Sequence, residues 1–124
     1  MFSCKNEMQL IESEFKNGSP KVVGLYTVDT DTIKSGELHY YPNEQLRMKA
    51  SFDPDGLRSG SWEYYYEDGT PWSFCEYKSG VKHGGSSVFY KNGKLRYVGK
   101  YNSDQVVSGS FKYYNEAGEL VKEE

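Results

Sequence analysis

Few side chains in this sequence have the chemistry of a catalytic or metal site, and they are scattered along its 124 residues. The histidines are His39 and His83, and neither lies near a cysteine at the spacing of metal ligands. The spacing suggests no serine–histidine–acid or cysteine–histidine arrangement. We therefore expect no catalytic residue, no metal ligand and no cofactor, and a protein that is not an enzyme.

Aspartates alternate at two places, Asp29 with Asp31 and Asp53 with Asp55, in a way that resembles a calcium-binding loop. The twelve-residue ligand pattern of such a loop and its closing glutamate are missing. Aspartate side chains also accept hydrogen bonds from nearby backbone N–H groups in turns. We therefore expect these aspartates to form turns.

The cysteines have different settings. Cys75 lies within a stretch of apolar residues, where a small buried side chain opposite a bulky one is expected. Cys4, within Phe2 to Asn6, resembles the lipid-bearing cysteine at the end of a bacterial lipoprotein signal, and is a candidate for lipidation. The apolar stretch that should precede it is absent. As written, the chain is expected in the cytoplasm; a start that omits an export signal would make it an envelope lipoprotein.

Charge and composition exclude some classes of protein. A net charge of −3 and a pI near 5.5 provide no electrostatic footprint for nucleic acid. No apolar run approaches the ~20 residues of a membrane-spanning helix. Twelve tyrosines and two tryptophans compensate for scarce aliphatic residues, because each aromatic ring buries a large area. We expect a core rich in tyrosine.

The chain is an internal repeat. Glycines at 36, 60, 85 and 109 are each followed five residues later by a tyrosine, and residues 15–26 superimpose on residues 90–101 as a fifth copy. This pattern predicts a tail over residues 1–7 and one repeat domain over residues 8–124. The expected copies are 8–35, 36–59, 60–84, 85–108 and 109–124.

Each copy has the pattern of a β-hairpin. Asp68-Gly69 predicts a two-residue turn that pairs Tyr64 with Ser73 and Trp62 with Cys75. The chain is therefore expected to be all-β, a single antiparallel meander of about five tandem β-hairpin repeats. Because a lone sheet exposes both faces, we expect the sheet to twist and curl until its core face lines a trough.

Alternation assigns the side chains to two faces. The expected core face carries Leu38, Tyr40, Leu46, Met48, Ala50, Phe52, Trp62, Tyr64, Tyr66, Pro71, Ser73, Cys75, Tyr77, Phe89, Leu95, Tyr97, Gly99, Tyr101, Phe111, Tyr113 and Leu120. The expected outer face carries a ladder of Tyr41, Tyr65, Tyr90 and Tyr114, with His39, Arg47, Lys49, Glu63, Trp72, Phe74, Glu76, Arg96, Lys100 and Lys112.

The stretch from Gly60 to Gly84 contains Gly-x-Trp-x-x-Tyr-x-x-x-Gly, followed by Tyr-Lys-x-Gly-x-x-x-Gly. It resembles the MORN repeat, most closely the variant found in tandem in bacterial proteins of the YwqK-type antitoxin family. The resemblance implies a protein-binding module, an antitoxin or immunity-like protein that binds and neutralises a partner toxin.

An outward row of aromatic rings would supply rigid anchors for such a partner. The candidate contact residues are Tyr41, Tyr65, Trp72, Phe74, Tyr90, Tyr114, Arg47 and Arg96. Rings that only stiffen neighbouring strands remain the structural alternative. The functional alternative is an envelope lipoprotein whose Arg47, Lys49, Arg96 and Lys100 contact anionic lipid headgroups.

Overall fold

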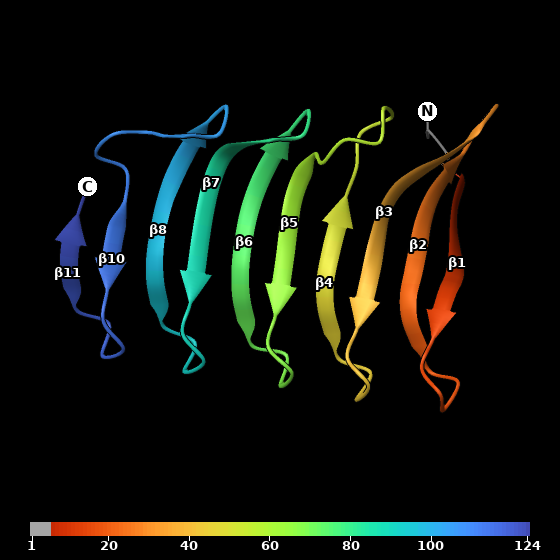
Figure 1. Ribbon diagram of the computed structural model, residues 1–124, viewed down its shortest axis with the longest axis horizontal. Coiled ribbons are helices and arrows are strands. Elements are labelled where there is room, and N and C mark those ends of the chain that lie inside the picture. Colours follow the sequence, from red (N-terminus) through yellow and green to blue (C-terminus); the bar gives the residue numbers. More distant parts are fainter. Residues whose placement is uncertain (1–5) are drawn as a thin grey trace, which may run out of the picture.

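The computed structural model describes residues 6–124 as one antiparallel sheet (Figure 1). Strand order follows chain order, except that β9 pairs only with β8 and β10 takes the next place in the sheet. The strands are β1 (Asn6–Glu14), β2 (Pro20–Val28), β3 (Thr32–Tyr40), β4 (Leu46–Ser51), β5 (Gly60–Tyr65), β6 (Pro71–Lys78), β7 (Val81–Phe89), β8 (Leu95–Asn102), β9 (Gln105–Val106), β10 (Lys112–Tyr114) and β11 (Leu120–Glu123).

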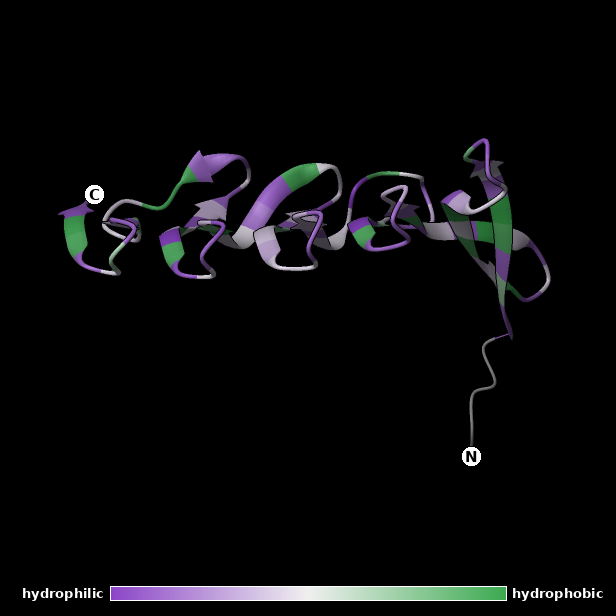
Figure 2. Ribbon diagram, turned by 90° about the horizontal axis from the view of Figure 1, so that it is seen from below, coloured by the Kyte–Doolittle hydropathy of each residue, from purple (hydrophilic) through white to green (hydrophobic). Residues whose placement is uncertain are grey.

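This architecture confirms the predicted all-β meander of hairpins. The expected trough is wrong, because the sheet stays open and is not strongly curled. β1 and β11 lie at the two ends of the strand order and do not meet. Seen from below, the strands form a single layer that turns at its N-terminal end, with no second layer over either face of the described chain (Figure 2). The sheet must therefore shield apolar groups within one layer.

That shielding comes from large rings beside small residues on one face. Trp62 on β5 pairs with Cys75 on β6. On the β4 side, Met48 pairs with Tyr64, and this register places Ala50 next to Trp62. Ala50 and Trp62 are only 1% and 5% exposed. A Cβ on Gly99 would approach the Phe111 ring to 2.3 Å, so glycine is needed there. We call the side that carries Trp62 and Phe111 the tryptophan face.

The turn of the central hairpin differs from the predicted one. Tyr66 N–H donates to the Thr70 carbonyl at 2.8 Å, so the loop contains Glu67, Asp68 and Gly69. In this loop only Gly69 has a positive φ, whereas the predicted turn needs it at Asp68 as well. A β-bulge at Trp72 then restores the register, and the predicted pairs Tyr64–Ser73 and Trp62–Cys75 are confirmed. The unpredicted bulge cancels the error in the turn.

Bulges in other hairpins reverse part of the predicted facing. Register shifts leave Arg47, Arg96 and Val121 without a partner across their hairpins. Phe89 therefore pairs with Leu95 on the opposite face, where its ring lies 5.9 Å from that of Phe74. The core-face assignment is likewise wrong for Leu38, Tyr40, Leu46, Pro71 and Leu120, and the outer-face assignment is wrong for His39.

Tyrosine hydroxyl groups tie successive hairpins together at their turns. The Tyr41 hydroxyl donates to the Tyr65 carbonyl at 2.6 Å, and the Tyr66 hydroxyl donates to the Phe89 carbonyl at 2.8 Å. The Tyr90 hydroxyl continues the series with the Tyr114 carbonyl at 2.8 Å. Tyr41, Tyr66 and Tyr90 are thus the equivalent residues, and the predicted ladder that included Tyr65 and Tyr114 is wrong.

Removing one hydroxyl of this series tests how much its hydrogen bond contributes to the free energy of unfolding. Tyr66→Phe keeps the ring and loses the bond to the Phe89 carbonyl, so we expect the free energy of unfolding to fall by about 0.5–1.5 kcal/mol. Tyr40→Phe is the matched control, because the Tyr40 hydroxyl is not among the tyrosine hydroxyls that donate a hydrogen bond in the described part of the chain. Chemical denaturation measures the free energy of unfolding of both variants. An equal effect of the two substitutions would contradict a stabilising role for the hydroxyl bonds of Tyr41, Tyr66 and Tyr90, which we call the hydroxyl ladder.

The two tryptophans differ in burial, and their truncation should separate core from surface. Trp62→Ala removes a ring that is 5% exposed and leaves a cavity, so we expect a loss of about 3–5 kcal/mol. Trp72 is 44% exposed, and Trp72→Ala should cost about 1 kcal/mol through lost ring contacts. Thermal and urea unfolding compare the variants, and a larger loss from Trp72→Ala would refute this placement of the core.

Candidate protein-binding surface

The predicted contact residues divide between the two faces. Five of them surround the hairpin turns on the tryptophan face, and three lie on the opposite face. The first group is Tyr41, Arg47, Trp72, Tyr90 and Arg96, and the second is Tyr65, Phe74 and Tyr114. They therefore cannot all contact one partner surface.

The bulge residues form a row across the sheet. Each is the unpaired residue near the start of the second strand of its hairpin, so each lies close to a turn. All are exposed. We call this row the bulge strip; it consists of Lys21, Arg47, Trp72, Arg96 and Val121.

Trp72 is the central member and is held by two rings. It stacks on Tyr66 with ring centroids 5.7 Å apart and meets the edge of Tyr64 at 6.1 Å. Tyr64 pairs with Ser73 next to Trp62 and Cys75, so these contacts place Trp72 on the tryptophan face. The prediction that Trp72 and Phe74 form one outer patch is wrong, because Phe74 contacts Tyr65 on the opposite face.

The cationic members of the strip also lie beside rings. The Arg96 guanidinium lies 5.8 Å from the centre of the Tyr90 ring, and the Lys21 ammonium lies 5.8 Å from that of Phe15. A cation over an aromatic ring is attracted by its quadrupole, by about 0.5–1 kcal/mol at exposed sites. Arg47 Nη2 lies 3.3 Å from His39 Nδ1. These contacts restrict the long side chains before any partner binds.

Charge is unevenly distributed between the faces. The carboxylates of strands β4 to β8 and β10 are Glu63 and Glu76, and both lie on the opposite face. On the tryptophan face, Arg58 lies 4.5 Å over Trp62 and Lys82 lies 4.9 Å over Tyr101. This part of the tryptophan face is therefore cationic, although the chain carries a net charge of −3.

The opposite face is self-contained around Tyr65. The rings of Tyr65 and Phe74 lie 6.0 Å apart, and the Tyr65 hydroxyl donates to Glu63 Oε1. Burial and this hydrogen bond raise the pKa of Tyr65 to about 12. Lys49 and Lys100 also lie on this face, so they do not share a surface with Arg47 and Arg96, as the lipid-contact alternative requires.

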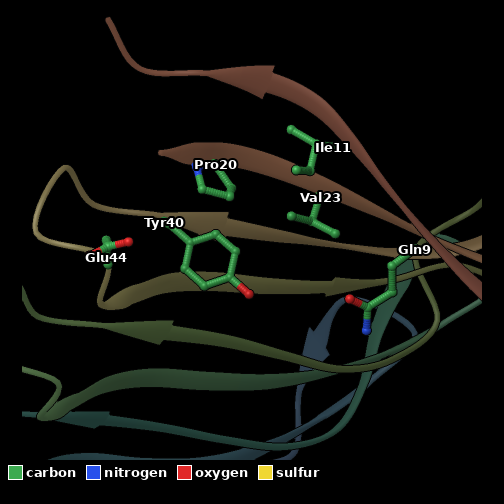
Figure 3. Close-up of a pocket in the computed structure, with 6 residues that line it drawn as sticks. All are labelled: Gln9, Ile11, Pro20, Val23, Tyr40 and Glu44. Carbon is green, nitrogen blue, oxygen red and sulfur yellow. The ribbon is translucent and has the colours of Figure 1, made fainter. Parts of the chain in front are cut away.

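A pocket lies at the N-terminal end of the opposite face, and the sequence did not predict it (Figure 3). It has a volume of about 450 Å³ and is lined by Gln9, Ile11, Pro20, Val23, Tyr40 and Glu44. Its lining is largely apolar, with Glu44 as its acidic residue. The bulge at Arg47 is what directs Tyr40 to this side, and no feature of the sequence alone marks that bulge.

Residues with catalytic or ligand chemistry have structural partners. His39 contacts Glu37 at 3.0 Å, and His83 Nδ1 accepts from the Ser103 backbone at 3.3 Å. The predicted turn at Asp53 is confirmed, because its carboxylate accepts the backbone N–H groups of Asp55 and Leu57. Burial raises the pKa of the half-buried Cys75 thiol.

Residues 6–124 contain neither a candidate metal site nor a candidate membrane-spanning helix. Within that range, no three or more histidine, cysteine, aspartate or glutamate side chains are grouped so that they could hold a metal ion. The described chain also contains no helix of the length and hydropathy needed to cross a membrane. The candidate lipidation residue Cys4 lies outside the described residues.

The raised pKa of Tyr65 predicts a loss of stability in alkali. A group whose pKa rises on folding adds stability below its unfolded pKa, here 10.0, and that stability disappears as the pH rises to about 12. Tyr65→Phe has no proton to lose, so its free energy of unfolding should fall less than that of the wild type over this interval. Urea unfolding at several pH values measures the difference. An identical fall in both proteins would contradict the assignment.

Comparison with known proteins identifies the repeat. Residues 58–79 and 82–103 match the MORN repeat variant family. These segments contain β5 and β6, and most of β7 and all of β8. No curated protein and no solved structure matches the chain. The match concerns the repeat unit and leaves the antitoxin assignment as a prediction.

Proposed function

We propose that this protein is a non-enzymatic protein-binding module that contacts its partner through the bulge strip. The observation that carries the proposal is Trp72, an exposed indole held against Tyr66 on a face whose central strands have no carboxylate. Arg47 and Arg96 lie on the same face, one hairpin away on either side.

The chemistry of this surface suits protein recognition. Tryptophan, tyrosine and arginine are the residues that most often dominate binding energy at protein interfaces. A ring that is already packed loses little conformational entropy when a partner covers it. The hydroxyl ladder between turns adds rigidity, because it fixes each hairpin relative to the next.

The more specific form of the proposal is that the partner is a toxin, which this protein neutralises as an antitoxin or immunity-like protein. The resemblance of residues 60–84 to the tandem variant of the YwqK-type antitoxin family supports this form. In that case the bulge strip would cover a surface that the toxin needs for its action. Tyr41 and Tyr90 would border the contact, and Tyr65, Phe74 and Tyr114 would lie outside it.

Affinity capture with the intact protein and two variants tests the proposed surface. Trp72→Ala removes the central anchor, and we expect its partner to bind at least about 30-fold more weakly, as at a hot spot that contributes 2 kcal/mol. Phe74→Ala is the matched control on the opposite face and should bind the same partner as the wild type. Circular dichroism confirms that each variant is folded at the assay temperature.

The capture experiment can contradict the proposal in two ways. If Trp72→Ala recovers the partner as well as the wild type does, the bulge strip is not the contact surface. If Phe74→Ala alone loses the partner, the opposite face is the contact surface.

A further inference from the structure

We propose that the bulge strip recognises an acidic polypeptide segment in the polyproline II conformation, which crosses the hairpins beside their turns. The segment would carry carboxylates at positions i and i+6, opposite Arg47 and Arg96, and a proline at i+3, opposite Trp72. This inference rests on the proposed function and names the chemistry of the partner.

The members of the bulge strip are evenly spaced across the sheet. Arg47, Trp72 and Arg96 are the second residues of β4, β6 and β8, which are the second strands of three successive hairpins. Neighbouring strands lie about 4.8 Å apart, so successive members are about 10 Å apart and the two arginines about 19 Å apart.

One backbone conformation of a bound peptide matches this spacing. A polyproline II helix has three residues per turn and rises about 3.1 Å per residue, so i, i+3 and i+6 share one side at about 9 and 19 Å. An extended β-strand covers about 10 Å in three residues, but its side chains at i and i+3 point to opposite sides. Polyproline II therefore presents three side chains to three successive bulges.

The side chains of the strip also match such a segment chemically at each position. Arginine forms a planar fork that binds carboxylates with two hydrogen bonds, and both Arg47 and Arg96 are exposed. No described ion pair involves either guanidinium. Proline-rich segments dock onto exposed aromatic rings, and Trp72 stacked on Tyr66 provides such a surface. The order cation, ring, cation thus corresponds to acid, proline, acid.

The distribution of negative charge favours a polypeptide over a nucleic acid. The turns beside the strip carry exposed Glu44, Glu67, Asp68 and Glu116. A nucleic acid has a phosphate at every residue, and some of its charges would meet these carboxylates. An acidic peptide can place its charges only where the arginines lie.

Nuclear magnetic resonance titration with blocked synthetic peptides tests the inference on the whole protein. The probe is Glu-(Pro)5-Glu, which has the i, i+3, i+6 spacing. It should shift the indole N–H resonance of Trp72 and leave that of Trp62, which is bonded to the Ser51 carbonyl, in place. Binding should weaken as salt rises, because the contacts are exposed charges.

Peptide and protein controls isolate each feature. Glu-(Pro)4-Glu loses the register and Lys-(Pro)5-Lys reverses the charge, and each should bind at least tenfold more weakly. Arg47→Ala and Arg96→Ala should each weaken binding of Glu-(Pro)5-Glu several-fold. Lys100→Ala, on the opposite face, should leave it unchanged. Equal binding of the three peptides, or no shift of the Trp72 resonance with Glu-(Pro)5-Glu, would overturn the inference.

Other ligands are separate outcomes of the same titration. One such outcome is that the protein binds phosphatidylserine vesicles or oligodeoxythymidine, loses that binding in Arg96→Ala, and does not bind the peptide. In that case the ligand of the bulge strip would be a lipid surface or a nucleic acid and not an acidic segment. The capture experiment separates this inference from the proposed function. If Trp72→Ala loses the captured partner but Glu-(Pro)5-Glu does not bind, the inference fails and the protein-binding surface stands.

Discussion

The β-bulge beside each turn is the constraint on which the rest of this structure depends. A three-residue turn shifts the strands of a hairpin by one residue, and in four hairpins the bulge shifts them back by one. The bulge at Trp72 keeps Trp62 beside Cys75, so that large and small side chains pair across the tryptophan face. It also places an additional side chain on the tryptophan face next to the turn. One irregularity thus determines both the core and the bulge strip.

A single layer can hold this core because its large side chains cover their own neighbours. Trp62 lies beside Ala50 and Cys75, and Phe111 covers Gly99, so apolar area is removed from water without a second sheet. Hydroxyl bonds from Tyr41, Tyr66 and Tyr90 join the turns of successive hairpins. The molecule therefore does not need to curl, and both of its broad faces stay open to partners.

The same geometry gives the two faces different sets of exposed side chains. On the tryptophan face, the bulges display three cations and one indole; Arg96 and Trp72 lie over tyrosine rings, and the carboxylates of the central strands point away. On the opposite face, Glu63 accepts a hydrogen bond from Tyr65, and the Phe74 ring contacts those of Tyr65 and Phe89. Exposed groups already held in place support our proposal that the tryptophan face is the contact surface, because binding there would order little that was mobile.

The sequence by itself determined the repeat, the all-β class and the meander of hairpins, because alternation and turn residues are local signals. The predicted pairing of Trp62 with Cys75 is correct because the unpredicted bulge at Trp72 compensates for the longer turn. The sequence also identified Arg47, Trp72 and Arg96 as candidate contacts. Only the tertiary structure decided which candidates share a face. A bulge adds one residue to a strand and reverses every side chain beyond it, as at Phe89 and Tyr40, and no local residue pattern marked the bulge position. Only the tertiary structure also showed that the sheet stays open. Phe111 shields Gly99 within a single layer, and this contact exists only once the fold has brought their strands together.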